Sequence, residues 1–260
     1  MWPTPTSGRM LDIAVLSTTN WTNNWLIGFR DVTSAVVERT AISSILPDVG
    51  VGHKIPLMML GATVAPQILC FFSCFDSMVL DYIVRQNIGG TSLSYFILKQ
   101  LPFLPPSAFN ESDLLFLVPR TLELVYTSWD TKPLADDVWR DADDELRDGI
   151  HGQWNENKGS VGGHESSTSD LDKVEEDGIP LPPFKWDEDR RARLRAELDA
   201  YYAKLYGLTE EELRYIIDPT DIYGDDFPGE TFRVLKKKEI KQYGEYRTKR
   251  LVLKAWKRMK

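Results

Sequence analysis

Apolar and polar positions follow a strand-like pattern early in the chain and a helical one further on. Residues 25–31, WLIGFRD, alternate apolar and polar side chains, as a half-buried strand does. Residues 11–16 and 55–65 read as two further strands. From Pro66 to Gln86 the apolar residues recur at helical spacing, with a proline suited to the first turn. The pattern therefore predicts a small β-rich region followed by a buried helix.

Helical patterns dominate the second half of the chain. Residues 114–129 form an amphipathic helical pattern, and residues 187–206 have an acidic start and end before Gly207. Thr209 and Glu212 have the spacing of a capping box that opens a second short helix. Residues 218–229 are rich in turn-forming residues, and residues 230–260 read as a basic helical tail. The predicted fold class is α+β.

An acidic, polar segment separates these two parts. Residues 136–178 hold four basic and fourteen acidic side chains, a net charge of −10, and are rich in Gly, Ser and Asn. Such a composition is typical of a disordered linker. We therefore expect a mixed α/β domain at residues 1–135, a linker at 136–180, and a helical region with a basic tail at 181–260.

Composition narrows the expected setting and chemistry. Cys70 and Cys74, the only cysteines, lie four residues apart in an apolar run and read as two buried thiols in a reduced compartment. No histidine near them completes a zinc set, so no metal site is expected. The uncharged run 55–75 is interrupted by Pro56, Gly61 and Pro66, which argues against a membrane span. The first residues lack a secretion signal, so a cytoplasmic location is expected.

Residues 81–106 read DYIVRQNIGGTSLSYFILKQLPFLPP, and this run resembles the target-recognition region of large N6-adenine DNA methyltransferases of restriction-modification and phage-defence systems. Two earlier segments also resemble that family, namely WLIGFRD at 25–31 and VERTAISSILP at 37–47. The later segments that resemble it are AKLYGLTEEELRYIIDP at 203–219, 227–236 and 243–253. The chain departs from the family at Val37, where Asn or Asp is usual, and in its long acidic insert.

The resemblance covers the recognition half of such an enzyme and omits its catalytic half. Methylation needs a Gly-rich loop for S-adenosylmethionine and an Asn-Pro-Pro-aromatic loop for a flipped adenine. The chain has neither; residues 218–221, Asp-Pro-Thr-Asp, lack the second proline and the aromatic ring. No catalytic residue is therefore assigned, and S-adenosylmethionine is expected on a missing catalytic part. The resemblance implies double-stranded DNA as a partner, together with a separate catalytic subunit.

Candidate DNA contacts follow from the polar residues of the matching segments. Arginine reads guanine, Gln reads adenine, and Gly, Ser and Thr allow close contact with phosphates. The predicted DNA-binding residues are Arg30, Arg39, Thr40, Arg85, Gln86, Gly89, Gly90, Thr91, Ser92 and Lys99. Structural alternatives stand beside each group. Arg85 is spaced to pair with Asp81, Arg39 with a nearby acid, and the two glycines fit a helix C-cap.

The basic tail leaves several interpretations open. Residues 232–260 hold twelve basic and two acidic side chains, a net charge of +10, within a chain of net charge −8. The tail could grip the DNA backbone, form a solvated helix face, or pair with the acidic segment 136–178. The function expected is DNA target recognition without methyl transfer. The alternatives are a protein-interaction module, favoured by Val37 and the net charge, or a remnant of a truncated methyltransferase.

Overall fold

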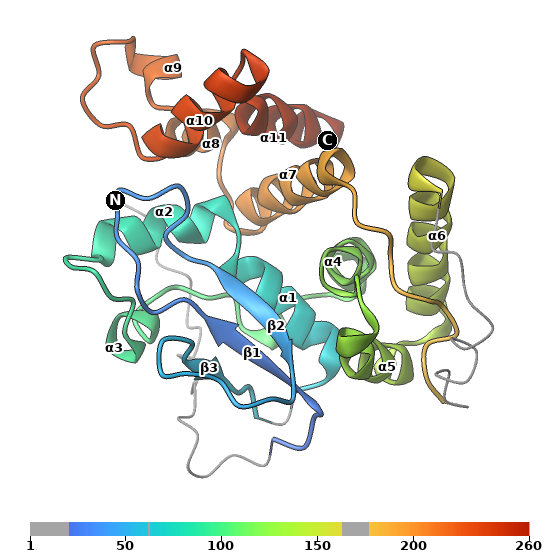
Figure 1. Ribbon diagram of the computed structural model, residues 1–260. Coiled ribbons are helices and arrows are strands. Elements are labelled where there is room, and N and C mark those ends of the chain that lie inside the picture. Colours follow the sequence, from blue (N-terminus) through green and yellow to red (C-terminus); the bar gives the residue numbers. More distant parts are fainter. Residues whose placement is uncertain (1–20, 62, 163–176, 260) are drawn as a thin grey trace.

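The N-terminal part of the described chain forms a small antiparallel sheet. The computed structural model describes residues 21–61, 63–162 and 177–259; the predicted strand at 11–16 lies outside them. The sheet contains β1 (Trp25–Phe29), β2 (Ser43–Pro47) and β3 (Leu57–Met58), in the order β2-β1-β3 (Figure 1). Ile27 pairs with Ile45 on one side and with Met58 on the other. The strand expected over 55–65 is therefore only two residues long, because the following residues turn into a helix.

Strand β1 is fully buried, and the prediction that it is half-buried is wrong. It is the central strand, and Phe29 packs against Phe75 with ring centroids 6.0 Å apart. On the other face, a Cβ on Gly28 would come within 2.5 Å of Ile55 Cγ2. Glycine at position 28 therefore leaves room for Ile55, just before β3, to cover a face of β1 that the alternating sequence pattern predicts to be polar.

The helix predicted from Pro66 to Gln86 is two helices, α1 (Ala65–Phe75) and α2 (Met78–Asn87). The break follows from side chains that take up the free backbone groups at the junction. Ser77 accepts a hydrogen bond from Leu80 N–H (3.3 Å), and the Asp199 carboxylate accepts one from Met78 N–H (2.7 Å). In the described residues no single helix is long and apolar enough to cross a membrane; α1 and α2 meet that test only as a pair, bent by 57°.

Short elements then lead to the helix that packs across α1. These are α3 (Tyr95–Leu98), a 3-10 turn at Pro106–Ala108, and α4 (Glu111–Val125). Helix α4 starts three residues earlier than the apolar pattern predicts. Asn110 and Asp113 form a reciprocal capping box there, which supplies hydrogen bonds for the first free N–H groups.

The prediction of a disordered linker over 136–180 is wrong for its first part. After a 3-10 turn at Trp129–Thr131, α5 (Lys132–Asp141) and α6 (Asp144–Val161) occupy it, and α6 stands beside α4 (Figure 1). Residues 163–176 lie outside the described part of the chain. The helices form because sparse apolar residues recur every four positions and become buried, namely Leu134, Val138, Leu146 and Ile150. Composition concealed this spacing, since acidic residues occupy the exposed faces.

The C-terminal region is helical, as predicted. It contains α7 (Glu188–Leu205), α8 (Glu210–Ile217), the short α9 (Thr220–Tyr223), α10 (Arg233–Tyr243) and α11 (Arg247–Arg258). The predicted capping box of Thr209 and Glu212 is confirmed, with both reciprocal hydrogen bonds present. Gly207 and Gly244 adopt positive φ angles of 72° and 74° where helices end, which explains glycine at these two positions.

Two hydrophobic cores hold these elements together. The first core joins the sheet, α1 and α4 to α5, α6 and residues such as Phe184 and Tyr202. The second core joins Met78 and Val79 of α2 to the C-terminal helices. The domain boundaries at residues 135 and 180 remain predictions. Each hydrophobic core, however, contains residues from both sides of these positions. The architecture as a whole is α+β, as expected.

Candidate functional site

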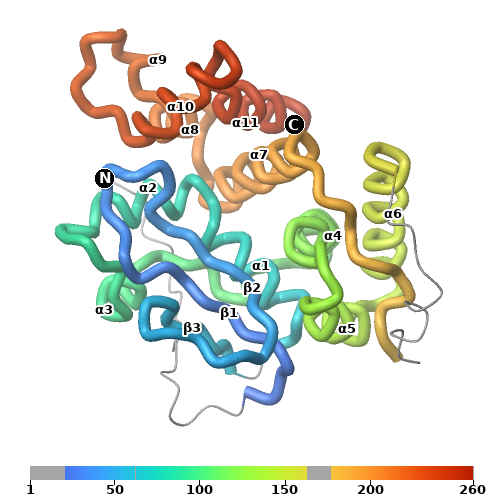
Figure 2. Tube along the Cα trace, viewed as in Figure 1, coloured from blue at the N-terminus to red at the C-terminus, as the bar shows by residue number. Residues whose placement is uncertain are grey.

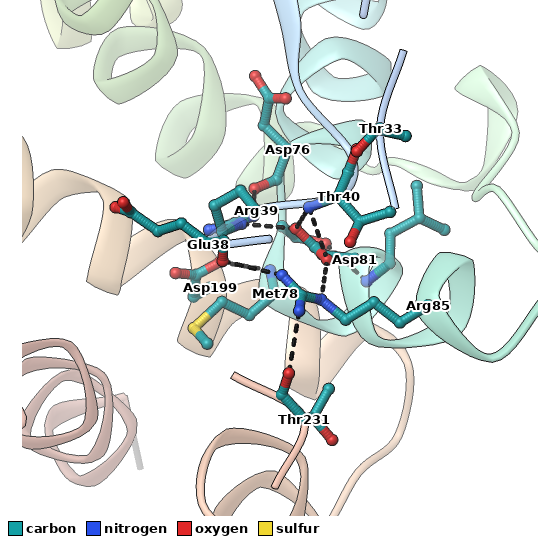
Figure 3. A network of polar contacts seen from close by, with 12 residues as sticks. Thr33, Glu38, Arg39, Thr40, Asp76, Met78, Asp81, Arg85, Asp199 and Thr231 are labelled. Carbon is teal, nitrogen blue, oxygen red and sulfur yellow. Dashed lines mark hydrogen bonds and ion pairs between the residues drawn. The ribbon is translucent and has the colours of Figure 1, made fainter. Parts of the chain in front are cut away.

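A buried carboxylate, Asp81, organises the polar residues that the sequence singled out. It is fully buried, and it accepts hydrogen bonds from Arg39 Nε (2.7 Å), Arg85 Nε (2.7 Å) and the Thr40 backbone N–H (3.0 Å). Figure 3 shows these three donors converging on it. Burial alone would lower the pKa of Arg39, but the attraction of Asp81 raises it above its usual value. The cluster is therefore a buried network of ion pairs and hydrogen bonds that stabilises the fold.

Arg85 extends this network of hydrogen bonds to the C-terminal region. Its Nη1 donates to the carbonyl oxygens of Ala35 (3.1 Å) and Thr231 (2.9 Å), and its Nη2 donates to that of Glu38 (2.8 Å). Figure 2 shows the β1–β2 loop lying close to the segment that leads into α10. Arg85 therefore ties the α2 helix, this loop and the C-terminal region together.

Arg30 and Thr40 serve the same loop. The Arg30 guanidinium donates to Thr33 Oγ1 (3.1 Å) and to the Arg39 carbonyl (2.5 Å). Thr40 is fully buried, and its hydroxyl donates to the Ser34 carbonyl (2.8 Å). The structural alternatives for Arg85 and Arg39, pairing with an acid, are confirmed. In this structure Arg39, Thr40 and Arg85 use their donors to shape the protein, so we no longer propose these three or Arg30 as base readers.

The other six predicted DNA-binding residues form an exposed rim, defined as Gln86, Gly89, Gly90, Thr91, Ser92 and Lys99. All six are exposed at the surface. Two backbone hydrogen bonds hold the rim to residues 31–33, from Thr33 N–H to the Thr91 carbonyl (3.1 Å) and from Leu93 N–H to the Asp31 carbonyl (2.8 Å). The Ser92 hydroxyl also donates to the Asp31 carboxylate. The rim is thus an exposed loop with a defined conformation.

Nothing inside the protein requires glycine at positions 89 and 90. Neither residue has a positive φ, and a Cβ on either one would meet open space. Gly89 directly follows Ile88, the C-cap residue of α2, but it lacks the positive φ with which a glycine ends a helix, so the helix C-cap alternative is wrong. Among the described residues, the backbone N–H groups from Gly89 to Ser92 donate to no protein acceptor. Glycines without an internal role suit the close approach of an external group to the backbone.

Among the described residues, six basic side chains of the tail form ion pairs, most of them with acids of the C-terminal region. Lys236 and Lys249 both pair with Asp218, at 2.9 and 3.0 Å, and Lys238 pairs with Glu38 at 2.8 Å. Arg247 pairs with Asp189 at 2.8 Å. Within the described ranges no ion pair joins the tail to residues 136–162 or 177–178. The predicted pairing with the acidic segment therefore finds no support in this part of the chain.

A cavity of about 750 Å³, lined by both apolar and charged side chains, lies between β2, the α1–α2 junction, α4 and α7. The sequence reading did not identify it. Its charged lining includes Arg39, Arg191 and Arg195, together with the carboxylates of Asp76 and Asp199. Burial raises the pKa of both carboxyls to about 6; for Asp76 the Ser43 N–H opposes this effect, and for Asp199 Arg39 does. Burial and the neighbouring Arg195 lower the pKa of Arg191 to about 10.

Two hydroxyl groups in the cavity wall lack a normal hydrogen bond. The Thr121 side chain is 1% exposed, and its Oγ1 has no partner among the described residues. The Ser43 hydroxyl also makes no hydrogen bond of normal geometry, although it lies close enough to Asp76 to lower that group's pKa. Buried hydroxyls without partners are uncommon in folded proteins. One signal in the sequence pointed to this cavity: Arg191, Arg195 and Asp199 lie four residues apart on a predicted helix and therefore share one face.

Two further predictions concern reactive and metal-binding groups. Cys70 and Cys74 are buried free thiols in α1, as expected, and burial raises the pKa of Cys74 to about 11. Within the described part of the chain, no group of three His, Cys, Asp or Glu side chains is arranged to hold a metal ion.

We compared the chain with models of known protein families, with curated proteins and with solved structures, and none of the three comparisons gave a match.

Proposed function

We propose that the chain is the DNA target-recognition part of an adenine-specific DNA methyltransferase of a restriction-modification or phage-defence system. It would contact duplex DNA through the rim and depend on a separate catalytic part for S-adenosylmethionine and methyl transfer. The observation that carries the proposal is the pair Gly89-Gly90, which is exposed, free of conformational strain and followed by Thr91 and Ser92.

The rim has the chemistry of a phosphate-contacting loop. Free backbone N–H groups and hydroxyls donate to phosphate oxygens, and glycine lets the phosphate approach closely. Lys99 adds a positive charge, and Gln86 offers an amide of the kind that reads adenine. The network around Asp81 supports this assignment indirectly, because it fixes the loop segment to which the rim is bound.

The test is a salt titration of binding to mixed-sequence duplex DNA. Gly90→Val places a bulky side chain where the structure has open space, so the fold is retained while close approach is blocked. Lys99→Ala removes one phosphate contact. We expect the affinity of wild type to fall steeply with salt, Gly90→Val to weaken binding at least tenfold, and Lys99→Ala to reduce the salt slope by about one.

Lys158→Ala serves as the matched control, because this lysine is an exposed cation on α6, away from the rim. It should leave both the affinity and the slope unchanged. Absence of binding at low salt, or equal weakening by Lys158→Ala and Lys99→Ala, would reject the proposal.

The protein-interaction module remains the second candidate. Phe96 is 77% exposed on α3, between the rim loop and Lys99, and an exposed aromatic side chain is typical of protein contacts. If Phe96→Ala and Gly90→Val abolish binding to a catalytic subunit while DNA does not bind, this alternative replaces the first.

A further inference from the structure

Helix α7 presents a row of charges to the cavity. Arg191, Arg195 and Asp199 all line it, at intervals of four residues. With a rise of 1.5 Å per residue, the row extends about 12 Å along the helix axis. The two guanidinium groups come first and the carboxylate last, so the row has a cationic end at Arg191 and an acidic end at Asp199, where Arg39 also contributes a positive charge.

The cationic end has donors with few partners among the described residues. Arg195 is exposed and makes no ion pair or hydrogen bond with a described residue, although its charge lowers the pKa of Asp76 and Asp199; Arg191 donates only to the Leu124 carbonyl (2.8 Å). Burial lowers the pKa of Arg191, and repulsion from Arg195 adds to this effect. The unpartnered Thr121 hydroxyl is a buried donor in the same cavity wall. An anion held between these groups would satisfy the free donors and relieve the repulsion.

The acidic end has acceptors that are only partly used. Asp76 accepts from Ser43 N–H and Asp199 from Met78 N–H (2.7 Å), each through Oδ1. Neither Oδ2 atom receives a hydrogen bond from a described residue. Such oxygens suit amino or hydroxyl groups of a ligand, and they disfavour a second anion at this end.

We propose that this cavity binds a nucleoside monophosphate, with the phosphate between Arg191 and Arg195 beside Thr121, and the sugar hydroxyl and base amino groups toward Asp76 and Asp199. The cavity volume of about 750 Å³ lies within the ordinary range for small-molecule sites and far exceeds the size of inorganic phosphate. This inference does not depend on DNA recognition by the rim, because the two sites share no residue.

Isothermal titration calorimetry of the full chain with AMP, CMP, GMP and UMP tests the proposal, with adenosine and inorganic phosphate as partial ligands. We expect at least one nucleotide to bind more tightly than adenosine and phosphate. Arg191→Gln and Arg195→Gln should each lower the affinity for that nucleotide at least tenfold. Thr121→Val should also weaken binding of that nucleotide; because the Thr121 hydroxyl has no hydrogen-bond partner among the described residues, thermal stability should be retained.

Gly90→Val should not change nucleotide affinity, which separates this site from the rim. If none of the four nucleotides binds, the proposal is overturned. The same holds if Arg191→Gln and Arg195→Gln weaken duplex DNA binding instead, since the cavity would then hold a backbone phosphate of DNA. Equal affinity of the three variants and wild type for the nucleotide would also overturn it.

Discussion

At the residue scale, the charged side chains of the β1–β2 loop and α2 are structural rather than exposed. Asp81 forms ion pairs with both Arg39 and Arg85 in the interior, where an unpaired charge would be costly. The sequence already contained the Asp81–Arg85 spacing, and so this pair was predictable as one alternative. The contacts of Arg39 with Asp81, forty-two residues away, were not, because they depend on how α2 packs beside the loop.

Asp81→Asn should destabilise the fold by about 3–5 kcal/mol, because both arginines lose their buried counter-charge. Chemical denaturation measures this loss. Glu245→Gln is the matched control, since Glu245 and Arg250 form an ion pair at 2.8 Å in which both side chains are exposed, and such pairs contribute little to stability. A loss below 1 kcal/mol for Asp81→Asn would contradict the structural role given to this carboxylate.

Asp199 should make stability depend on pH. Burial raises the pKa of the folded-state Asp199 carboxyl to about 6, above its ordinary value of 3.8, so ionisation costs stability above pH 6, and this cost disappears as the pH falls toward about 4. Arg39 and Arg195 oppose the shift, and Asp81 adds to it. Relative to Asp199→Asn, wild type should gain up to about 3 kcal/mol between pH 7 and pH 4. Denaturation of both proteins across this range provides the measurement, and a constant difference would contradict the prediction.

At the element scale, helix starts were the most predictable features. Asp187, Thr209 and Glu212 cap α7 and α8 where the sequence indicated, because capping involves only neighbouring residues. Strand lengths were less predictable, since pairing partners are distant in the chain. The helices of the acidic segment were missed because a few apolar residues at helical spacing outweigh an acidic composition once they meet a core.

Gly28→Ala should destabilise the sheet by about 1–3 kcal/mol, because the new Cβ would overlap Ile55 Cγ2 at 2.5 Å and Leu46 Cδ1 at 2.9 Å. Thermal unfolding measures the loss. Gly61→Ala is the control, as its Cβ would meet no atom within 4 Å, and it should change stability little. Similar unfolding temperatures for the two variants would show that β3 does not cover this face of β1.

At the scale of the whole molecule, the two cores cross the predicted boundaries. Met78 and Val79 belong to α2 but pack in the second core, and Tyr202 belongs to α7 but packs in the first. We therefore expect the described regions to unfold together rather than as two independent domains.

Leu213→Ala tests this coupling, because Leu213 is fully buried in the second core and its truncation should cost about 2–5 kcal/mol. Cys70 and Cys74 report on the first core, since both thiols are buried there. In the variant, their reaction with a thiol reagent should begin at the same lowered denaturant concentration at which circular dichroism changes. Loss of helical signal before any thiol reacts would instead indicate two independent units.

The sequence by itself determined local features of this protein: the α+β class, the capping box of Thr209 and Glu212, the buried cysteines and the glycine-rich loop of the rim. These depend on the spacing of neighbouring residues. Only the tertiary structure decided which charged residues face inward and where a cavity remains. Arg39 and Arg85 became internal supports because distant segments surround Asp81, and Arg191 and Arg195 came to face Thr121 because α7 packs beside α4. Burial depends on packing between segments that are distant in the chain, and the local spacing of residues does not specify that packing.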